Sequence, residues 1–195
     1  MNWNRRRVLR AGGALAGVSA AALLTGRAMG RDTAAAHRAV RSKVAPGDRR
    51  IALLNLHTDE RLEIEYSRDG TYVSEALSAI QVLLRDFRTG EQHVIDPSLL
   101  DYLVEVAHRV GADPVFSVIS GYRSPQTNAA MHEKSAGVAQ HSLHMEGRAI
   151  DVRMTGINCA DLAARAEDLQ RGGVGYYRAS NFVHLDTGAF RIWKG

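Results

Sequence analysis

The sequence is poor in cysteine. Cys159 is the one cysteine among 195 residues, so the chain cannot form an intramolecular disulfide. An exported domain of about 165 residues is nevertheless large enough to bury its own hydrophobic core. No cysteine lies directly after the apolar N-terminal run, which disfavours a lipoprotein.

Several patterns that mark other protein classes are also missing. The sequence has no internal repeat, and no low-complexity tract beyond its N-terminal segment. Aromatic and basic residues do not interleave as they would in a groove for bases, so we expect no nucleic-acid partner. No serine or cysteine stands in a histidine-containing elbow, which disfavours a nucleophilic hydrolase.

The N-terminus carries an export pattern. Residues 4–10, NRRRVLR, fit the twin-arginine motif, and residues 11–26 carry no charge. That uncharged run is shorter than the ~20 residues of a membrane span. Small residues at Ala28 and Gly30 suit cleavage after Gly30. We predict a twin-arginine signal peptide over residues 1–30, a periplasmic protein and no stable membrane span after cleavage; an uncleaved signal anchor is the alternative.

The basicity of the whole chain belongs to this segment. It contains five arginines and no acidic residue, so its removal changes the formal net charge from +4 to −1. The sequence pI of about 9.5 therefore says nothing about nucleic acid. Residues 31–50 are polar and of mixed charge, and we predict that they form a linker before a domain at 51–195.

The apolar pattern after the linker predicts short strands and amphipathic helices. Asp96 and Pro97 supply an N-cap and an N1 proline for one of these helices. We predict a β-hairpin over 51–57 and 61–67, helices over 75–87, 97–110, 126–134 and 158–170, and strands over 115–119, 148–154, 182–186 and 190–193.

Residues 140–151, QHSLHMEGRAID, resemble a metal-binding segment. Catalytic zinc takes three imidazole or carboxylate ligands and leaves a fourth position to water. His144 and Asp151 are seven positions apart, and a bend at Gly147 would let both converge. If the strand carrying His184 pairs with the strand carrying Asp151, the third ligand meets them. The alternative is that these histidines lie on the surface or cap helices.

Alternation along the two strands predicts which side chains share a face. Asp151 would share a face with Arg153, and His184 would share one with Phe182 and Asp186. Asp186 would then suit a general base or a group that orients His184. Four further histidines lie in polar surroundings and are predicted to be solvated: His57, His93, His108 and His132.

Three motifs resemble a known family. SLHMEGRAID matches the S-x-H-x-x-G-x-A-x-D signature of the zinc D,D-peptidase superfamily, which contains VanX-type dipeptidases, D-Ala-D-Ala carboxypeptidases and the Hedgehog fold. SGYRSPQTN, at residues 120–128, resembles the substrate-binding arginine segment. GGVGYYRASNFVHLDTGAFRIW resembles the murein endopeptidase K branch. The resemblance covers about residues 51–193 and implies an α+β fold with a mainly antiparallel sheet, helices packed on one side and a zinc cleft on the open face.

The resemblance also implies the roles of four residues. One Zn²⁺ ion would be held by His144, Asp151 and His184. Arg123 would bind a substrate carboxylate or carbonyl, a role that suits the planar fork of arginine. A structural salt bridge from Arg123 to Asp151 or Asp186 is the alternative.

The sequence departs from the family at the general base. Many relatives carry an acid three residues before the last ligand, where this chain has Asn181, and others carry a histidine where it has Phe182. Asp186 is the first candidate for the base, His141 the second and Glu146 the third. A zinc ion acting with weak base assistance is a further alternative.

The expected function is therefore a zinc metallopeptidase, a murein endopeptidase that hydrolyses peptide cross-links of peptidoglycan. Its partners would be the peptide stems of the cell wall. Whether it cuts the D-Ala–diaminopimelate or the diaminopimelate–diaminopimelate link stays open. The alternatives are a non-hydrolytic, zinc-stabilised module that binds cell-wall peptides and a D,D-carboxypeptidase that trims stems.

Overall fold

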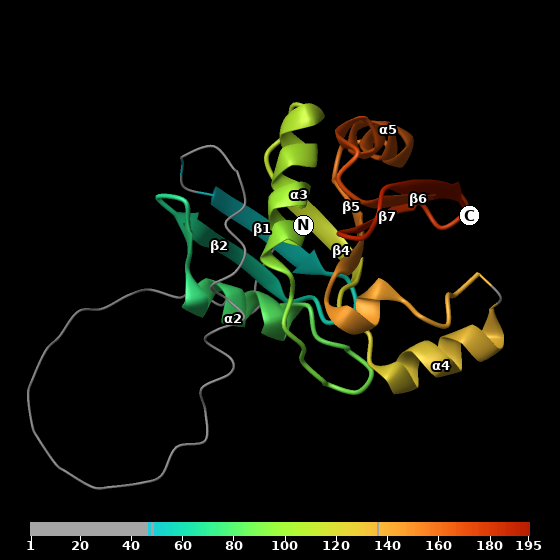
Figure 1. Cartoon of the computed structure of the whole chain (residues 1–195). Helices are drawn as coiled ribbons and strands as arrows, with labels where there is room; N and C mark the ends of the chain where they lie inside the picture. The colour runs from blue at the N-terminus through green and yellow to red at the C-terminus, as the bar shows by residue number, and fades with distance from the viewer. Residues whose placement is uncertain (1–46, 48, 136) are drawn as a thin grey trace, which may run out of the picture.

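The computed structural model describes residues 47, 49–135 and 137–195 (Figure 1). The predicted signal peptide and the predicted linker through residue 46 lie outside the described residues. Arg49 and Arg50, predicted to end the linker, instead open the first strand. None of the helices in the described part of the chain has the length and apolar character that a membrane span needs.

The described residues form one sheet of eight strands, in the order β3-β2-β1-β4-β5-β7-β6-β8. Strands β1 and β4 pair in parallel, as do β6 and β8, and the other neighbours are antiparallel. The predicted α+β fold with a mainly antiparallel sheet is confirmed. The strands are β1 (Arg49–Asn55), β2 (Arg61–Arg68), β3 (Thr71–Tyr72), β4 (Val115–Ser120), β5 (Ala149–Arg153), β6 (Gly173–Tyr177), β7 (Phe182–Asp186) and β8 (Arg191–Lys194).

Helices α2, α3 and α5 form the expected layer against one face of the sheet (Figure 1). Helix α4 stands apart from this layer, at the lower right of Figure 1, and buries only Thr127 and Asn128. A short 3₁₀ helix, η1, precedes β5. The helices are α2 (Ser74–Leu83), α3 (Pro97–Arg109), α4 (Pro125–Lys134), η1 (Leu143–Glu146) and α5 (Cys159–Leu169).

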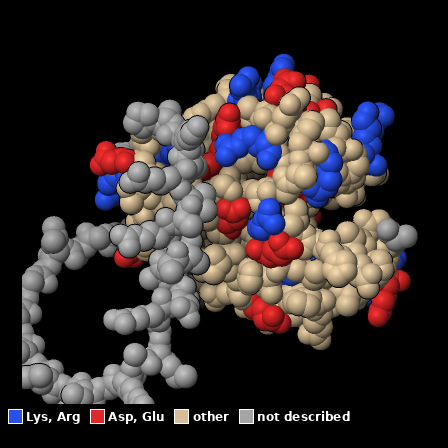
Figure 2. Space-filling view, viewed as in Figure 1, with Lys and Arg blue, Asp and Glu red and all other residues tan. Residues whose placement is uncertain are grey.

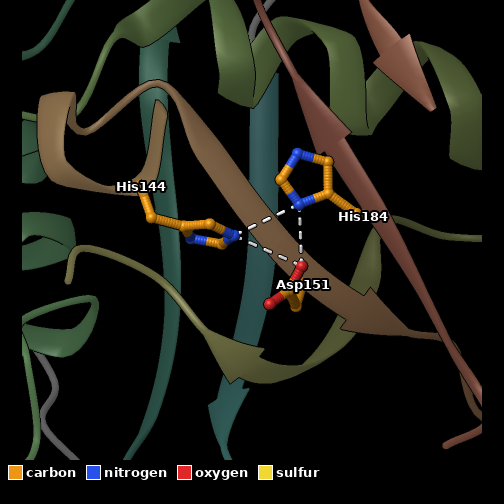
Figure 3. A group of neighbouring side chains, drawn as sticks. All are labelled: His144, Asp151 and His184. Atoms are coloured by element: carbon orange, nitrogen blue, oxygen red, sulfur yellow. Dashed lines mark hydrogen bonds and ion pairs between the residues drawn. The ribbon is translucent and has the colours of Figure 1, made fainter. Parts of the chain in front are cut away.

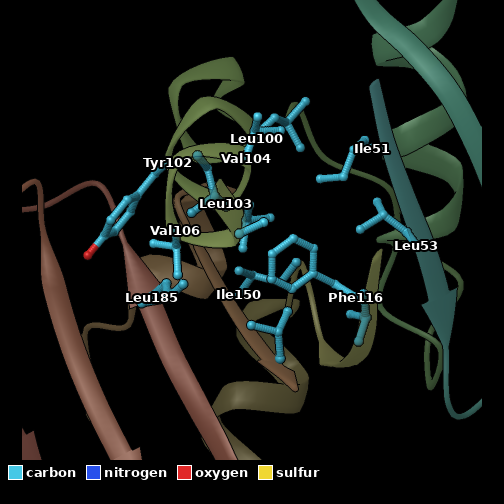
Figure 4. Packing of buried hydrophobic residues seen from close by; sticks show 14 of the residues in the cluster. Ile51, Leu53, Leu100, Tyr102, Leu103, Val104, Val106, Phe116, Ile150 and Leu185 are labelled. Carbon is cyan, nitrogen blue, oxygen red and sulfur yellow. The ribbon is translucent and has the colours of Figure 1, made fainter. Parts of the chain in front are cut away.

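The core fills the space between the helical layer and the sheet. Ile150 of β5 and Leu185 of β7 are fully buried in it, together with side chains of α3 such as Leu103 (Figure 4). Because successive strand residues point to opposite faces, their neighbours Asp151 and His184 lie on the other face of the sheet. The predicted alternation of apolar and polar faces in these two strands is confirmed.

Helix α2 ends at Leu83, four residues before the predicted end at Phe87. The carbonyl of Leu84 accepts a hydrogen bond from the backbone amide of Tyr122 at 2.8 Å. Because the Leu84 carbonyl is bound by Tyr122, it cannot accept the hydrogen bond that a further turn of α2 would require. The contact joins the end of α2 to the segment that carries Arg123.

The start of α3 is joined to the predicted metal segment. Asp96 caps the helix as predicted, since its Oδ1 accepts from the amide of Ser98 at 2.9 Å. Its own amide donates to the carbonyl of Gly147 at 3.0 Å. Its Oδ2 accepts from the Thr187 hydroxyl at 2.7 Å, just beyond β7. One capping residue thus fixes the ends of two elements that carry predicted ligands.

Candidate metal centre

The register of β5 and β7 brings two predicted ligands together. Asp151 lies directly opposite His184 in the antiparallel pair, so both side chains project from the same face. The sequence predicted this meeting only on condition that the two strands pair. The structure meets that condition.

The third predicted ligand, His144, is supplied by η1. The Ser142 hydroxyl caps this turn by accepting from the amide of His144 at 3.4 Å. Gly147 then takes a left-handed conformation with φ of 66°, and the chain turns into β5. A Cβ at this position would lie 2.0 Å from the carbonyl oxygen of Val94, so only glycine fits. The predicted bend at Gly147 is confirmed.

Three donor atoms converge at the centre of the group (Figure 3). Nδ1 of His184 lies 2.9 Å from Oδ1 of Asp151 and 3.2 Å from Nε2 of His144, and the remaining pair is 3.3 Å apart. Tetrahedral zinc with bonds of about 2.0–2.1 Å would hold its ligand atoms about 3.3 Å from one another. The spacing therefore suits a small divalent cation.

The partners of His144 leave a lone pair on the nitrogen that faces this group. Its Nδ1 lies 2.7 Å from the carbonyl oxygen of Gly121, which can only accept, so the ring proton is on Nδ1. Burial lowers the pKa of His144, which favours the neutral ring. A neutral imidazole with a fixed tautomer is the form in which histidine binds metal.

His184 is held between two carboxylates. Its Nε2 donates to Oδ2 of Asp186 at 3.0 Å, and its Nδ1 faces Asp151. Burial opposes a charge on this ring, but the two carboxylates outweigh burial and raise the pKa of His184 to about 9. The pKa of Asp151 is lowered; burial would raise it, but His144 and His184 outweigh burial. The carboxylates of Asp151 and Asp186 favour positive charge at His184. A metal ion bound at Nδ1 of His184 would supply that charge in place of the Nδ1 proton.

Asp186 lies behind His184 and is not among the residues that line the cleft. It is fully buried. Its two oxygens accept from His184, from the guanidinium of Arg191 and from the amides of Gly173 and Gly188. The sequence offered a base or an orienting group, and the geometry fits the orienting group because Asp186 contacts the ring nitrogen that points away from the centre.

The three donor groups open into a cleft of about 480 Å³. One wall is the segment between α4 and η1, including Val138 and His141. The opposite wall is aromatic, with Tyr177 of β6, Phe182 of β7 and Trp193 of β8. A cleft with polar donors at its base and aromatic side chains along one wall has the character of a site for a peptide or other organic ligand.

The other candidates for the base occupy different places. His141 is exposed and lines the cleft. Glu146 is exposed outside the cleft and pairs with Arg148 at 3.1 Å. Asn181 is an exposed turn residue with φ of 51°, a left-handed conformation that asparagine tolerates better than most residues.

Arg123 lines the cleft beside the centre and is only 6% exposed. One guanidinium nitrogen lies 3.7 Å from Oδ2 of Asp151, a loose ion pair, and the other donates to Asn128 at 3.3 Å. Burial lowers its pKa, an effect that Asp151 opposes. Its Nε has no partner among the described residues. The arginine thus keeps a donor unused beside the centre.

Sequence reasoning missed the contribution of β8 to the site. Trp193 and Arg191 both line the cleft, although residues 190–193 were predicted only as an edge strand. A signal was present in the alternating glycines of β6. A Cβ at Gly173 would meet Asp186 and Arg191, and one at Gly175 would meet the Trp193 ring. The four histidines predicted to be solvated are exposed: His57, His93, His108 and His132.

The fold and the site together define a class of protein. Two imidazoles and one carboxylate, held by orienting partners at the base of a cleft, are the arrangement of a metal-dependent hydrolase. The chain belongs to the family described as peptidoglycan L,D-endopeptidase MepK, a family of M15 metallopeptidases, which matches residues 43–193.

Similar proteins support this membership. The chain is 40% identical over 151 residues to a probable peptidoglycan L,D-endopeptidase MepK of Haemophilus influenzae, covering 77% of this chain and 81% of that protein. It is 39% identical over 148 residues to the peptidoglycan L,D-endopeptidase MepK of Escherichia coli K12, covering 76% of this chain and 81% of that protein. No solved structure matches the chain.

Proposed function

We propose that this protein is a zinc-dependent endopeptidase that cleaves peptide cross-links of peptidoglycan. The observation that carries the proposal is the convergence of His144, Asp151 and His184, with donor atoms 2.9–3.3 Å apart at the base of a cleft. A single zinc ion bound there would activate water and polarise the scissile carbonyl. Family membership supplies the substrate class, which geometry alone does not.

The cross-link proposed is the L,D type, between two diaminopimelate residues. The support is the name shared by the relatives, peptidoglycan L,D-endopeptidase. The sequence had left this link and the D-Ala–diaminopimelate link open. Both substrates present carboxylates beside the scissile bond, and Arg123 is the buried cation that would bind a carboxylate and set the register.

His141 is the proposed general base. Histidine is the side chain that most often transfers protons in enzymes, and this one is exposed on the wall of the cleft. It would take a proton from the attacking water and return it to the leaving amine. Asp186 would hold the ring of His184 in its ligating orientation. Glu146 is a weaker candidate because it lies outside the cleft and pairs with Arg148.

We further propose that the protein works in the periplasm after export by the twin-arginine route. The support is the NRRRVLR motif at residues 4–10 and the uncharged run that follows it. Peptidoglycan lies outside the cytoplasmic membrane, so an enzyme that cuts it needs export.

A fusion of residues 1–36 to a reporter, compared with a variant in which Arg5 and Arg6 are lysines, tests the route.

Digestion of purified cell wall tests the function. The zinc-loaded protein should release monomeric muropeptides from L,D-cross-linked dimers, and His184→Ala should release none. His108→Ala is the matched control, because His108 is exposed on α3. Binding without cleavage would favour the non-hydrolytic module. That alternative remains because this chain has Asn181 where many relatives carry an acidic residue. Release of free D-Ala would favour a carboxypeptidase.

A further inference from the structure

Tyr177 stands on the same face of the sheet as the candidate metal ligands. In the pairing of β6 with β7, Gly175 lies opposite His184, and Tyr177 lies opposite Phe182. Directly opposed residues share a face, so Tyr177 projects on the side of His184. The side chain lines the cleft, whereas its neighbour Tyr176 packs against the hydrophobic core.

The hydroxyl of Tyr177 is fixed in position and keeps its proton for another group. The indole Nε1–H of Trp193 donates to the phenolic oxygen at 3.0 Å. The Tyr177 ring stacks on Phe182, with centroids 4.5 Å apart and planes 14° from parallel. A phenol that accepts one hydrogen bond can still donate one. Among the described residues, no acceptor for that proton is present.

Trp193 is itself held by the sheet. It pairs with Gly175 in the parallel register of β6 and β8, and a Cβ on Gly175 would lie 2.4 Å from its ring. The indole fits there because position 175 has no side chain. Its centroid is 5.1 Å from that of His184. One indole thus connects the hydroxyl of Tyr177 to the ring of a candidate ligand.

We propose that the Tyr177 hydroxyl donates a hydrogen bond to the carbonyl oxygen of the scissile peptide, and that Trp193 positions it. This inference rests on the proposed function. When water adds to the carbonyl carbon, a C–O bond forms and the π electrons move onto the carbonyl oxygen. The water proton passes to His141 and then to the leaving nitrogen as the C–N bond breaks. A donor aimed at the charged oxygen stabilises the transition state more than the substrate.

Arg123 does not make this donor redundant. Its two terminal guanidinium nitrogens already contact Asp151 and Asn128, and among the described residues only its Nε is left without a partner. Tyr177 is a neutral donor, so it stabilises the oxygen chiefly when that oxygen gains charge. We therefore expect the loss of Arg123 to affect mainly KM, and the loss of the Tyr177 hydroxyl to affect mainly kcat.

Tyr177→Phe tests the proposal, with Tyr176→Phe as the matched control on the core side of the same strand. The substrates are a purified L,D-cross-linked dimer and a phosphinate analogue whose tetrahedral oxygens mimic the charged carbonyl oxygen. Loss of one such donor should lower kcat by about 100-fold, with KM within about twofold. Affinity for the phosphinate should fall by a similar factor. Zinc content, melting temperature and affinity for the cleaved product should not change.

Trp193→Phe keeps an aromatic ring but removes the indole donor. It should lower kcat and phosphinate affinity in the same direction as Tyr177→Phe but by less, since the hydroxyl remains and loses only its anchor. Adding Trp193→Phe to Tyr177→Phe should change neither value further, because the two residues act through one hydroxyl.

Three results would overturn the proposal. These are an unchanged kcat in Tyr177→Phe, a loss confined to KM, or a kcat loss matched by lost zinc. If the wild-type protein cleaves no dimer, the proposed function fails. The affinity for the phosphinate analogue still tests the role of Tyr177 in that case. Equal phosphinate affinity in wild type and Tyr177→Phe would then refute the donor role independently.

Discussion

Oδ2 of Asp186 accepts a hydrogen bond from Nε2 of His184 at 3.0 Å, on the side of the ring opposite the candidate metal centre. The same oxygen accepts from Arg191 at 2.7 Å. The pKa of Asp186 is lowered; burial would raise it, but the hydrogen bonds from His184 and Arg191 outweigh burial. A carboxylate in this position fixes the tautomer of a ligand histidine and strengthens its donor nitrogen.

Asp186→Asn should weaken metal binding without removing the ligands. The loss of an orienting partner of this kind costs about 10–100-fold in metal affinity. Competition with a chromogenic chelator measures the zinc dissociation constant. Asp168→Asn is the matched control, because Asp168 is exposed on α5 and pairs with the exposed Arg165. Equal zinc affinity in the two variants would show that Asp186 has no orienting role.

His141→Ala should abolish most activity and leave zinc in place. A positioned general base contributes about 10²–10⁴-fold, so kcat should fall within that range. His108→Ala, exposed on α3 and outside the cleft lining, is the control. A variant that keeps kcat would transfer the role to another group.

Arg123→Lys should raise KM more than it lowers kcat. Lysine keeps the charge but loses the planar fork that binds a carboxylate through two hydrogen bonds. A charge-assisted hydrogen bond contributes about 1.5–3 kcal/mol, which corresponds to an increase in KM of roughly 10–100-fold. Steady-state kinetics on the cross-linked dimer measure the two constants. An unchanged KM would favour the alternative, a structural pair between Arg123 and Asp151.

Gly147→Ala should destabilise the fold more than Gly156→Ala. Both glycines have positive φ, so each alanine costs about 1–2 kcal/mol in the left-handed region. At Gly147 the new Cβ would also lie 2.0 Å from the Val94 carbonyl oxygen, whereas nothing lies within 4 Å at Gly156. Urea denaturation compares the two free energies of unfolding. Equal losses would mean that the contact with Val94 relaxes without cost.

Asp86 should make stability depend on pH in the acid range. Burial alone would raise its pKa, but hydrogen bonds from Thr127, Ser124 and the amide of Arg88 outweigh burial and lower the pKa to about 2. The folded state therefore binds the proton more weakly than the unfolded chain. The contribution of Asp86 is full above about pH 4 and is lost as pH falls towards about 2.

Asp86→Asn measures that contribution. It should cost about 1–3 kcal/mol at pH 7, because the amides and hydroxyls around position 86 lose a charged acceptor. The difference in free energy of unfolding between wild type and variant should shrink between about pH 4 and pH 2. A difference that stays constant over that range would show that Asp86 does not titrate with folding. Denaturant titrations at each pH supply both curves.

The sequence determined the parts of this protein that depend on short-range pattern. The period of two in β5 and β7 is readable in AIDVR and FVHLD, because a strand with the apolar core on one face and polar ligands on the other must alternate. The cap at Asp96 and the bend at Gly147 are equally local. The spacing of His144, Asp151 and His184, set against a known motif, was enough to identify the candidate ligands.

Only the tertiary structure decided which side of His184 Asp186 occupies, and which residues form the walls of the cleft. Residues two apart on a strand share a face, but that rule does not say which ring nitrogen the second residue reaches. Trp193 enters the site because β8 pairs in parallel with β6, a contact between separate segments. The end of α2 at Leu83 likewise depends on Tyr122, nearly forty residues later. Such choices depend on contacts between distant segments, which a local pattern of residues does not encode.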